Sequence, residues 1–200
     1  MIDGRLRTWI DPPLGRVARS IAATGIGADA ITIVSALCGI AAAAAVAFGA
    51  FPAALVLFLL NRLGDGLDGP VARLTRATDR GAFLDIALDF VVYAAFPLGF
   101  AVHAPGNALP AAILLASYLA NGSAFLAFAA LARKRELATA AQGRKSIYYL
   151  AGLAEGFETI VFMVAACLFP AAFPVLAGAF AALCGVSAGA RLVLGWKLLG

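Results

Sequence analysis

The chain has 200 residues, of which 63% are hydrophobic and only 13% are charged, and its mean hydropathy is +0.95. Soluble domains carry about 25% charged residues, so this composition excludes an ordinary soluble domain and predicts an all-α integral membrane protein. The net charge is +4, but the basic residues flank apolar segments instead of forming a stripe interleaved with aromatics. This layout favours membrane lipid or an anionic substrate as the partner and disfavours nucleic acid.

The first 27 residues mix basic and apolar side chains. Such a mixture is typical of an amphipathic helix that lies on an anionic leaflet, with Trp9 at the level of the headgroups. We therefore expect residues 1–27 to form an interfacial segment ahead of the membrane core. Its basic residues are Arg5, Arg7, Arg16 and Arg19.

Six apolar runs follow, each long enough for a helix that crosses a hydrocarbon core of about 30 Å. The loops between the runs are short and no internal repeat is present, so we expect a single domain over residues 1–200 with a six-helix core from 28 to 196. The expected transmembrane helices are 28–49, 51–73, 81–103, 107–132, 147–169 and 172–196.

The Lys and Arg residues predict the orientation. They gather in the N-terminal segment, in the loops after the second and fourth runs, and in the C-terminal tail, whereas the three intervening loops contain none. Cytoplasmic flanks of membrane helices collect positive charge. Both termini should therefore face the cytoplasm in a multi-pass protein of the cell inner (cytoplasmic) membrane.

Four aspartates lie inside these apolar runs. Asp65 and Asp68 are three residues apart near the cytoplasmic end of the second run, and Asp85 and Asp89 are four apart near the start of the third. Both spacings place a pair on one helical face. Because the connecting loop is short, the two helices should be antiparallel neighbours. All four carboxylates are then expected to converge on one cavity that opens to the cytoplasm.

A charged side chain at the centre of a membrane helix costs about 2.5–3.5 kcal/mol on insertion scales, so these carboxylates need a compensating role. Two divalent cations would neutralise their mutual repulsion. Oxygen ligands with no His or Cys nearby favour Mg²⁺ or Mn²⁺, and paired ions of this kind suit displacement at phosphorus. The alternative is that the carboxylates simply pair with nearby arginines, namely Arg62, Arg73, Arg76 and Arg80.

The segment Asp65-Gly-Leu-Asp68-Gly-Pro-Val-Ala-Arg73, followed by Gly81-Ala-Phe-Leu-Asp-Ile-Ala-Leu-Asp89, resembles the signature D-x-x-D-G-x-x-A-R…G-x-x-x-D-x-x-x-D of the CDP-alcohol phosphotransferases. Every fixed position is present. The resemblance implies a homodimeric six-helix membrane enzyme that cleaves the pyrophosphate of a CDP-linked substrate and releases CMP. Within the family, the chain is most similar in appearance to bacterial phosphatidylglycerophosphate synthase homologues.

The resemblance also implies roles for individual residues. Asp65, Asp68 and Asp85 would be metal ligands, and Asp89 would be the general base and a ligand of the second metal. The chain departs from the family pattern at Asp29, where members often have an amide side chain. The residues implied in the cytidine nucleotide site are Thr32, Gly69, Ala72, Arg73 and Gly81.

The site of the acceptor alcohol is expected among residues of the fifth and sixth runs and of the loop before the fifth. Glu155 would lie about 13 Å deep, level with Asp65, and Glu158 one turn further. These glutamates would hydrogen-bond a polyol or attract an amino-alcohol. An acceptor phosphate would instead need cations, and Lys145 and Arg191 would supply them. The simpler alternatives are that Lys145 is only a positive flank, that Glu155 pairs with Arg62, and that Arg191 extends to the headgroups.

These observations favour a transferase that moves a phosphatidyl group from CDP-diacylglycerol to a small polar alcohol, such as glycerol 3-phosphate or another polyol. One alternative is the transfer of a CDP-amino-alcohol's phosphoalcohol to diacylglycerol. An alternative from a different class is a cation-coupled transporter. Transporter sites usually lie near the midplane between repeats, whereas these aspartates lie near the cytoplasmic edge and no repeat is present.

Overall fold

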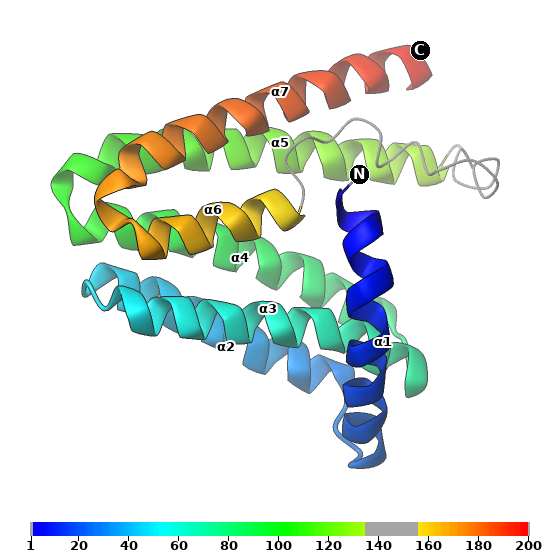
Figure 1. Ribbon diagram of the computed structural model, residues 1–200. Helices are drawn as coiled ribbons and strands as arrows, with labels where there is room; N and C mark the ends of the chain where they lie inside the picture. Colours follow the sequence, from blue (N-terminus) through cyan, green and yellow to red (C-terminus); the bar gives the residue numbers. More distant parts are fainter. Residues whose placement is uncertain (1, 135–155, 200) are drawn as a thin grey trace.

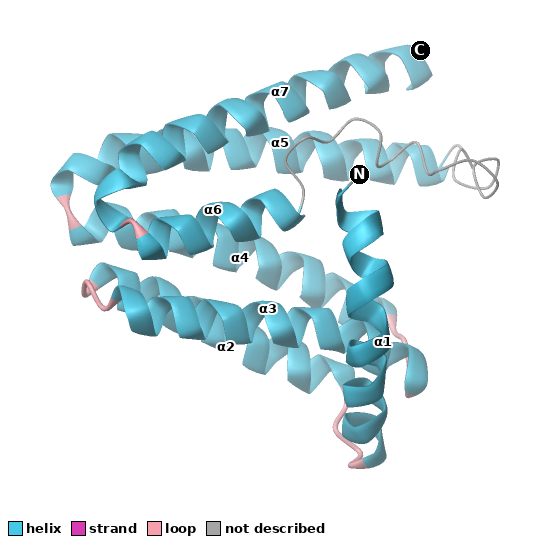
Figure 2. Ribbon diagram, viewed as in Figure 1, coloured by secondary structure: helices cyan, strands magenta, loops and turns pink. Residues whose placement is uncertain are grey.

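The computed structural model describes residues 2–134 and 156–199, and every regular element in these two ranges is a helix (Figure 2). The all-α prediction is thus confirmed for the described residues. The α-helices are α1 (Ile2–Ala23), α2 (Ala28–Ala47), α3 (Phe51–Leu74), α4 (Asp79–His103), α5 (Ala108–Lys134), α6 (Gly156–Leu168) and α7 (Phe173–Leu199), with the 3-10 turns η1 (Pro105–Asn107) before α5 and η3 (Pro170–Ala172) before α7.

Glycine and proline mark the ends of several helices. Gly25 and Gly49 follow α1 and α2 with φ angles of 82° and 74°, a left-handed conformation that residues with a Cβ adopt only at a cost. Pro105 and Pro170 open the turns before α5 and α7, where the missing N–H of proline is not needed by a helix. The helices therefore end or begin next to these glycines and prolines, whose backbone properties favour the turns between the apolar runs.

Within the described residues, four helical stretches are long and apolar enough to cross a membrane: Ala28–Ala47, Asp79–His103, Pro105–Leu131 and Pro170–Leu199. They correspond to the first, third, fourth and sixth expected spans. The second expected span coincides with α3, whose C-terminal half carries several charged residues. The described part of the fifth is α6, with 13 residues. The count of six spans stays a prediction for these two helices.

Helices α2 to α7 lie side by side, whereas α1 crosses them near the end where α3 leads into α4 (Figure 1). Leu14, Ala18 and Ile21 of α1 belong to a small apolar cluster with Leu67 and Val71 of α3. A helix that crosses the ends of the others fits a segment lying along a membrane surface. The interfacial role of residues 1–27 stays a prediction.

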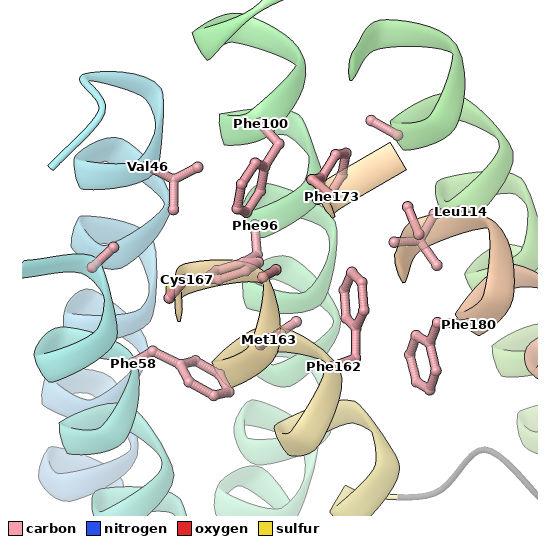
Figure 3. Packing of buried hydrophobic residues seen from close by; sticks show 14 of the residues in the cluster. Val46, Phe58, Phe96, Phe100, Leu114, Phe162, Met163, Cys167, Phe173 and Phe180 are labelled. Atoms are coloured by element: carbon pink, nitrogen blue, oxygen red, sulfur yellow. The ribbon is translucent and has the colours of Figure 1, made fainter. Parts of the chain in front are cut away.

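The bundle has two halves. Helix α2 packs on both α3 and α4 in one half, and α5 packs on α7 in the other, with α6 next to α3 and α7 (Figure 1). Buried aromatic rings connect these helices (Figure 3): Phe100 of α4 stacks on Phe173 with centroids 4.1 Å apart, which joins the halves, and Phe162 of α6 stacks on Phe180 of α7 at 4.9 Å. Such pairs contribute about 0.5–1.5 kcal/mol each beyond their area.

Small residues let α2 approach its neighbours closely. A Cβ added to Gly64 of α3 would lie 2.8 Å from the Cβ of Ser35, and one added to Gly99 of α4 would collide with the carbonyl oxygen of Ala43. Polar bonds reinforce the first contact: the Ser35 hydroxyl donates to the Asn61 carbonyl at 2.6 Å, and the Asn61 amide donates to the Ser35 carbonyl at 2.9 Å. Close backbones and interhelical hydrogen bonds are the usual means of helix association in membranes.

We predict that Gly99→Ala lowers the thermal unfolding midpoint of the protein in detergent, because the new methyl group would meet a backbone carbonyl that cannot rotate away. Overpacking of this kind costs about 1–3 kcal/mol. Gly189→Ala in α7 is the matched control, since a Cβ there meets nothing within 4 Å. Equal midpoints for the two variants would contradict the close contact of α2 with α4.

Candidate metal centre

Three aspartates from two helices meet between α3 and α4. Asp65 and Asp68 lie on α3, Asp85 lies on α4, and one carboxylate oxygen from each lies within 4.8 Å of the others. The short loop 75–78 reverses the chain between the helices. Thr78 caps α4 by accepting a hydrogen bond from the Gly81 N–H at 3.0 Å. The expected convergence of the two aspartate pairs therefore holds for these three carboxylates.

Asp68 is the most enclosed of the three, with 6% of its surface exposed. The Thr32 hydroxyl donates to Asp68 Oδ2 at 2.7 Å, and the Gly69 N–H donates to Asp68 Oδ1 at 2.6 Å. Helix α2 therefore orients a candidate metal ligand on α3. The nucleotide-binding role that the sequence resemblance implies for Thr32 stays a prediction, and its bond to Asp68 is an additional feature that only the structure reveals.

Asp89 is bound at both of its carboxylate oxygens by side chains outside the aspartate set. Its Oδ1 accepts a hydrogen bond from Arg62 Nη2 at 2.9 Å, and its Oδ2 accepts one from the Tyr93 hydroxyl at 3.3 Å. The candidate metal-holding group among the described residues consists of Asp65, Asp68 and Asp85. The sequence places all four aspartates on suitable faces, but Arg62 reaches across from α3 and binds the fourth.

Arg62 is the most highly connected side chain of the site, with 8% of it exposed. It donates to Asn61 Oδ1 from Nε at 2.9 Å and from Nη2 at 2.6 Å. It also donates from Nη1 to the Tyr93 hydroxyl at 3.0 Å and to Asp65 Oδ2 at 3.4 Å. Its guanidinium lies 5.7 Å from the Phe58 ring centroid. The alternative in which nearby arginines pair with the carboxylates is thus realised for Arg62.

Sequence reasoning assigned no role to Asn61 or Tyr93. Two signals were present in the sequence: Asn61 is a polar residue inside an apolar run, and Tyr93 lies four residues after Asp89, which places the two on one helical face. Neither signal shows that the pair would share a single arginine as partner.

The residues of the implied nucleotide site flank this cluster at the ends of α3 and α4. Arg73, exposed in the last turn of α3, lies along Gly69, where an added Cβ would be 3.5 Å from Arg73 Nη1. A Cβ on Gly81 would be 2.8 Å from Asp29 Oδ1. Asp29, the position that departs from the family pattern, pairs with Arg80 at 2.8 Å. Ala72 precedes Arg73 in the last turn of α3.

The expected acceptor residues are only partly described. Lys145 and Glu155 lie outside the described residues, and Glu158 is half-buried in the first turn of α6. Arg191 of α7 donates to Asn121 Oδ1 at 2.7 Å and lies 5.1 Å from the Phe125 ring centroid. These contacts place Arg191 in the α5–α7 half of the bundle, whereas the aspartates lie on α3 and α4. The convergence of all four acceptor candidates on the aspartates stays a prediction.

Arg191 borders an apolar groove of about 510 Å³ between α5 and α7. The groove lies toward the C-terminal ends of both helices. Its lining residues include Ala124, Phe128, Leu131, Gly195 and Trp196.

The described residues thus form a helical bundle whose partly buried carboxylate cluster could hold a divalent cation between two helices, and such sites occur in membrane enzymes that act on phosphate groups. A sequence model of the CDP-alcohol phosphatidyltransferase family matches residues 26–192 of the chain. The protein belongs to this family and is a transferase of its class.

Two similar proteins cover nearly the whole chain. The inner membrane protein YnjF of Escherichia coli K12 is 46% identical over 200 residues, which cover 100% of this chain and 97% of that protein. The crystal structure of Mycobacterium tuberculosis phosphatidylinositol phosphate synthase (PgsA1) with CDP-DAG bound matches with a TM-score of 0.69 and 22% identity, over 92% of this chain and 93% of that one. The second match shows a shared fold.

We predict that Asp85→Asn weakens the binding of Mn²⁺ to the purified protein by at least about tenfold, because one of three charged ligands is lost from the cluster. Free Mn²⁺ would be counted by electron paramagnetic resonance during a titration. Asp79→Asn, in the first turn of the same helix and exposed, is the matched control and should leave the affinity unchanged. Equal affinities in both variants would rule out Asp85 as a ligand.

Proposed function

We propose that the protein is a phospholipid-biosynthetic transferase that moves a phosphatidyl group from CDP-diacylglycerol to the hydroxyl of a small polar alcohol, glycerol 3-phosphate or another polyol, and releases CMP. The observation that carries this proposal is the cluster of Asp65, Asp68 and Asp85 in a member of the CDP-alcohol phosphatidyltransferase family. The choice of donor is supported by the shared fold with a synthase whose crystal structure holds CDP-DAG.

The donor atoms of the cluster suit Mg²⁺ or Mn²⁺, because three carboxylates without His or Cys form a set of hard oxygen ligands. We propose two such cations, with Asp65, Asp68 and Asp85 as ligands and Asp89 contributing to the second. When bound, the cations neutralise charge on the pyrophosphate and stabilise the oxygens at the reacting phosphorus.

Asp89 is the proposed general base. Arg62 and Tyr93 each bind one of its oxygens and so fix the direction of the carboxylate. In the proposed step Asp89 accepts the proton of the acceptor hydroxyl, whose oxygen forms a bond to the β-phosphorus. The bond from that phosphorus to the oxygen of CMP breaks, and CMP leaves with the electron pair.

The nucleotide is proposed to bind where α3 ends and α4 begins. Arg73 has the planar fork of donors that suits a phosphate, and it lies along Gly69, which presents no side chain. Gly81 leaves space beside Asp29 that a Cβ would fill. Thr32 and Ala72 complete the proposed set.

The acceptor is proposed to bind toward α6 and α7. Arg191 and Lys145 would attract an acceptor phosphate, and Glu155 and Glu158 would hydrogen-bond a polyol. The second candidate is the reaction in which a CDP-amino-alcohol donates to diacylglycerol. It is favoured by the half-buried Glu158, whose carboxylate would attract an amino-alcohol. Membership of a transferase family supports either reaction over a cation-coupled transporter.

We further propose a single domain over residues 1–200 that acts as a homodimer in the inner membrane, with six spans and with both termini and the active site facing the cytoplasm. Four apolar helices of membrane-crossing length support a multi-pass protein. The name of the E. coli relative supports the inner membrane. The distribution of Lys and Arg along the chain supports the orientation.

The test is a donor and acceptor screen with purified protein and Mg²⁺ or Mn²⁺. CDP-diacylglycerol with a panel of alcohols, and CDP-amino-alcohols with diacylglycerol, are compared by the CMP that each mixture releases, and the lipid product is identified by its mass. We expect CMP from CDP-diacylglycerol with a polyol or its phosphate. Release of CMP only from the CDP-amino-alcohols would establish the reverse arrangement, and ion flux in liposomes without CMP release would overturn the transferase proposal.

We predict that Asp89→Asn lowers kcat by about 100-fold or more, because general-base catalysis contributes at least that much in most enzymes. The exposed Asp79→Asn on the same helix should retain the wild-type rate. Turnover of CDP-diacylglycerol by folded Asp89→Asn at the wild-type rate would show that another group accepts the proton.

A further inference from the structure

A buried arginine stands between two parts of the aspartate set. Arg62 Nη2 lies 2.9 Å from Asp89 Oδ1, and Nη1 lies 3.4 Å from Asp65 Oδ2. Only 8% of the arginine side chain is exposed, against 27% and 31% for Asp89 and Asp65. The bulk solvent therefore screens its charge weakly.

The position of this guanidinium is fixed from several sides. Asn61 accepts from its Nε and Nη2, and Asn61 is itself bound to Ser35 of α2. Tyr93 accepts from Nη1 and donates to Asp89, which closes a ring of three hydrogen-bonded side chains. Arg62 is thus held by α2, α3 and α4 together, and a shift away from Asp89 would break several bonds at once.

A second cation of the proposed pair needs an oxygen of Asp89, and the oxygen nearest to Arg62 already has a positively charged partner. A divalent cation at this oxygen must either displace the guanidinium or bind beside it against its repulsion. The cluster of Asp65, Asp68 and Asp85 is affected less, because the one contact of Arg62 with it that the structure describes is the longer one to Asp65.

We propose that Arg62 is a positioning residue that bridges Asp89 and Asp65 and makes the site bind its second divalent cation more weakly than its first. The proposal rests on the proposed function, because it takes the cluster to be a cation site. In addition to its part in helix packing, Arg62 then supplies the positive charge beside Asp89 until the second metal ion competes for the same carboxylate.

The test measures Mn²⁺ binding without substrate, by electron paramagnetic resonance of free Mn²⁺ during titration of the purified protein in detergent. The wild type should show two classes of site, the second at least about tenfold weaker than the first, since the loss of one charge-assisted hydrogen bond is worth about a tenfold change. In Arg62→Gln the second site should tighten by about tenfold and the first should change less.

Two further variants separate positioning from a merely structural role. Arg62→Lys keeps the charge and should retain most of the wild-type gap between the two sites. Arg80→Gln is the matched control, since it removes another arginine bound to an aspartate, but one that is exposed and outside the cluster, and it should leave both affinities unchanged. Thermal unfolding midpoints would confirm that each variant is folded.

If Arg62→Gln does not fold, the same Mn²⁺ titration is carried out with Tyr93→Phe. It removes one hydrogen bond from Asp89 and one from Arg62, and the second site should then tighten severalfold. An unchanged gap in Arg62→Gln, or in Tyr93→Phe if Arg62→Gln does not fold, would overturn the proposal and leave the proposed function standing, and so would loss of the second site. A wild type that binds no Mn²⁺ would overturn both.

Discussion

The need to give charged side chains partners inside an apolar bundle shapes the half of the structure that holds the aspartates. Helix α3 carries both signs of charge, and two of its charged side chains have partners on other helices: Arg62 binds Asp89 of α4, and Thr32 of α2 donates to Asp68. Because an uncompensated charge in this setting costs several kcal/mol, these bonds dictate which helices must be neighbours. Helix α2 packs on both α3 and α4 in this half of the bundle, and its few polar side chains bond to residues of these two helices.

Packing away from the charges makes that arrangement rigid. Aromatic stacking joins α4 to α7 and α6 to α7, while contacts at Gly64 and Gly99 bring α3 and α4 against α2. Since a helix is stiff, its apolar half fixes the depth and rotation of its polar half. One carboxylate oxygen each of Asp65, Asp68 and Asp85 therefore comes within 4.8 Å of the others, although α3 and α4 make few close backbone contacts.

Pairing of charges is also found at the position where this chain departs from the family pattern. Asp29 stands where many members have an amide, and the structure pairs it with Arg80, beside the glycine that the pattern requires. The carboxylate of Asp29, which stands in place of an amide, is thus accompanied by the positively charged side chain of Arg80. Arg62 plays a comparable part deeper in the bundle, where a cation binds a carboxylate that lies next to the cluster.

The sequence by itself determined the helical class, the positions of the apolar runs, the family signature and the shared face of each aspartate pair, because hydropathy and helical period are local properties. The partners of those aspartates were decided only by the tertiary structure. Spacing gives the face and depth of Asp89, but not that Arg62 and Tyr93 reach it first, nor that Thr32 turns toward Asp68. Such choices depend on how closely α2 approaches α3 and α4, which is set by packing between residues far apart in the chain.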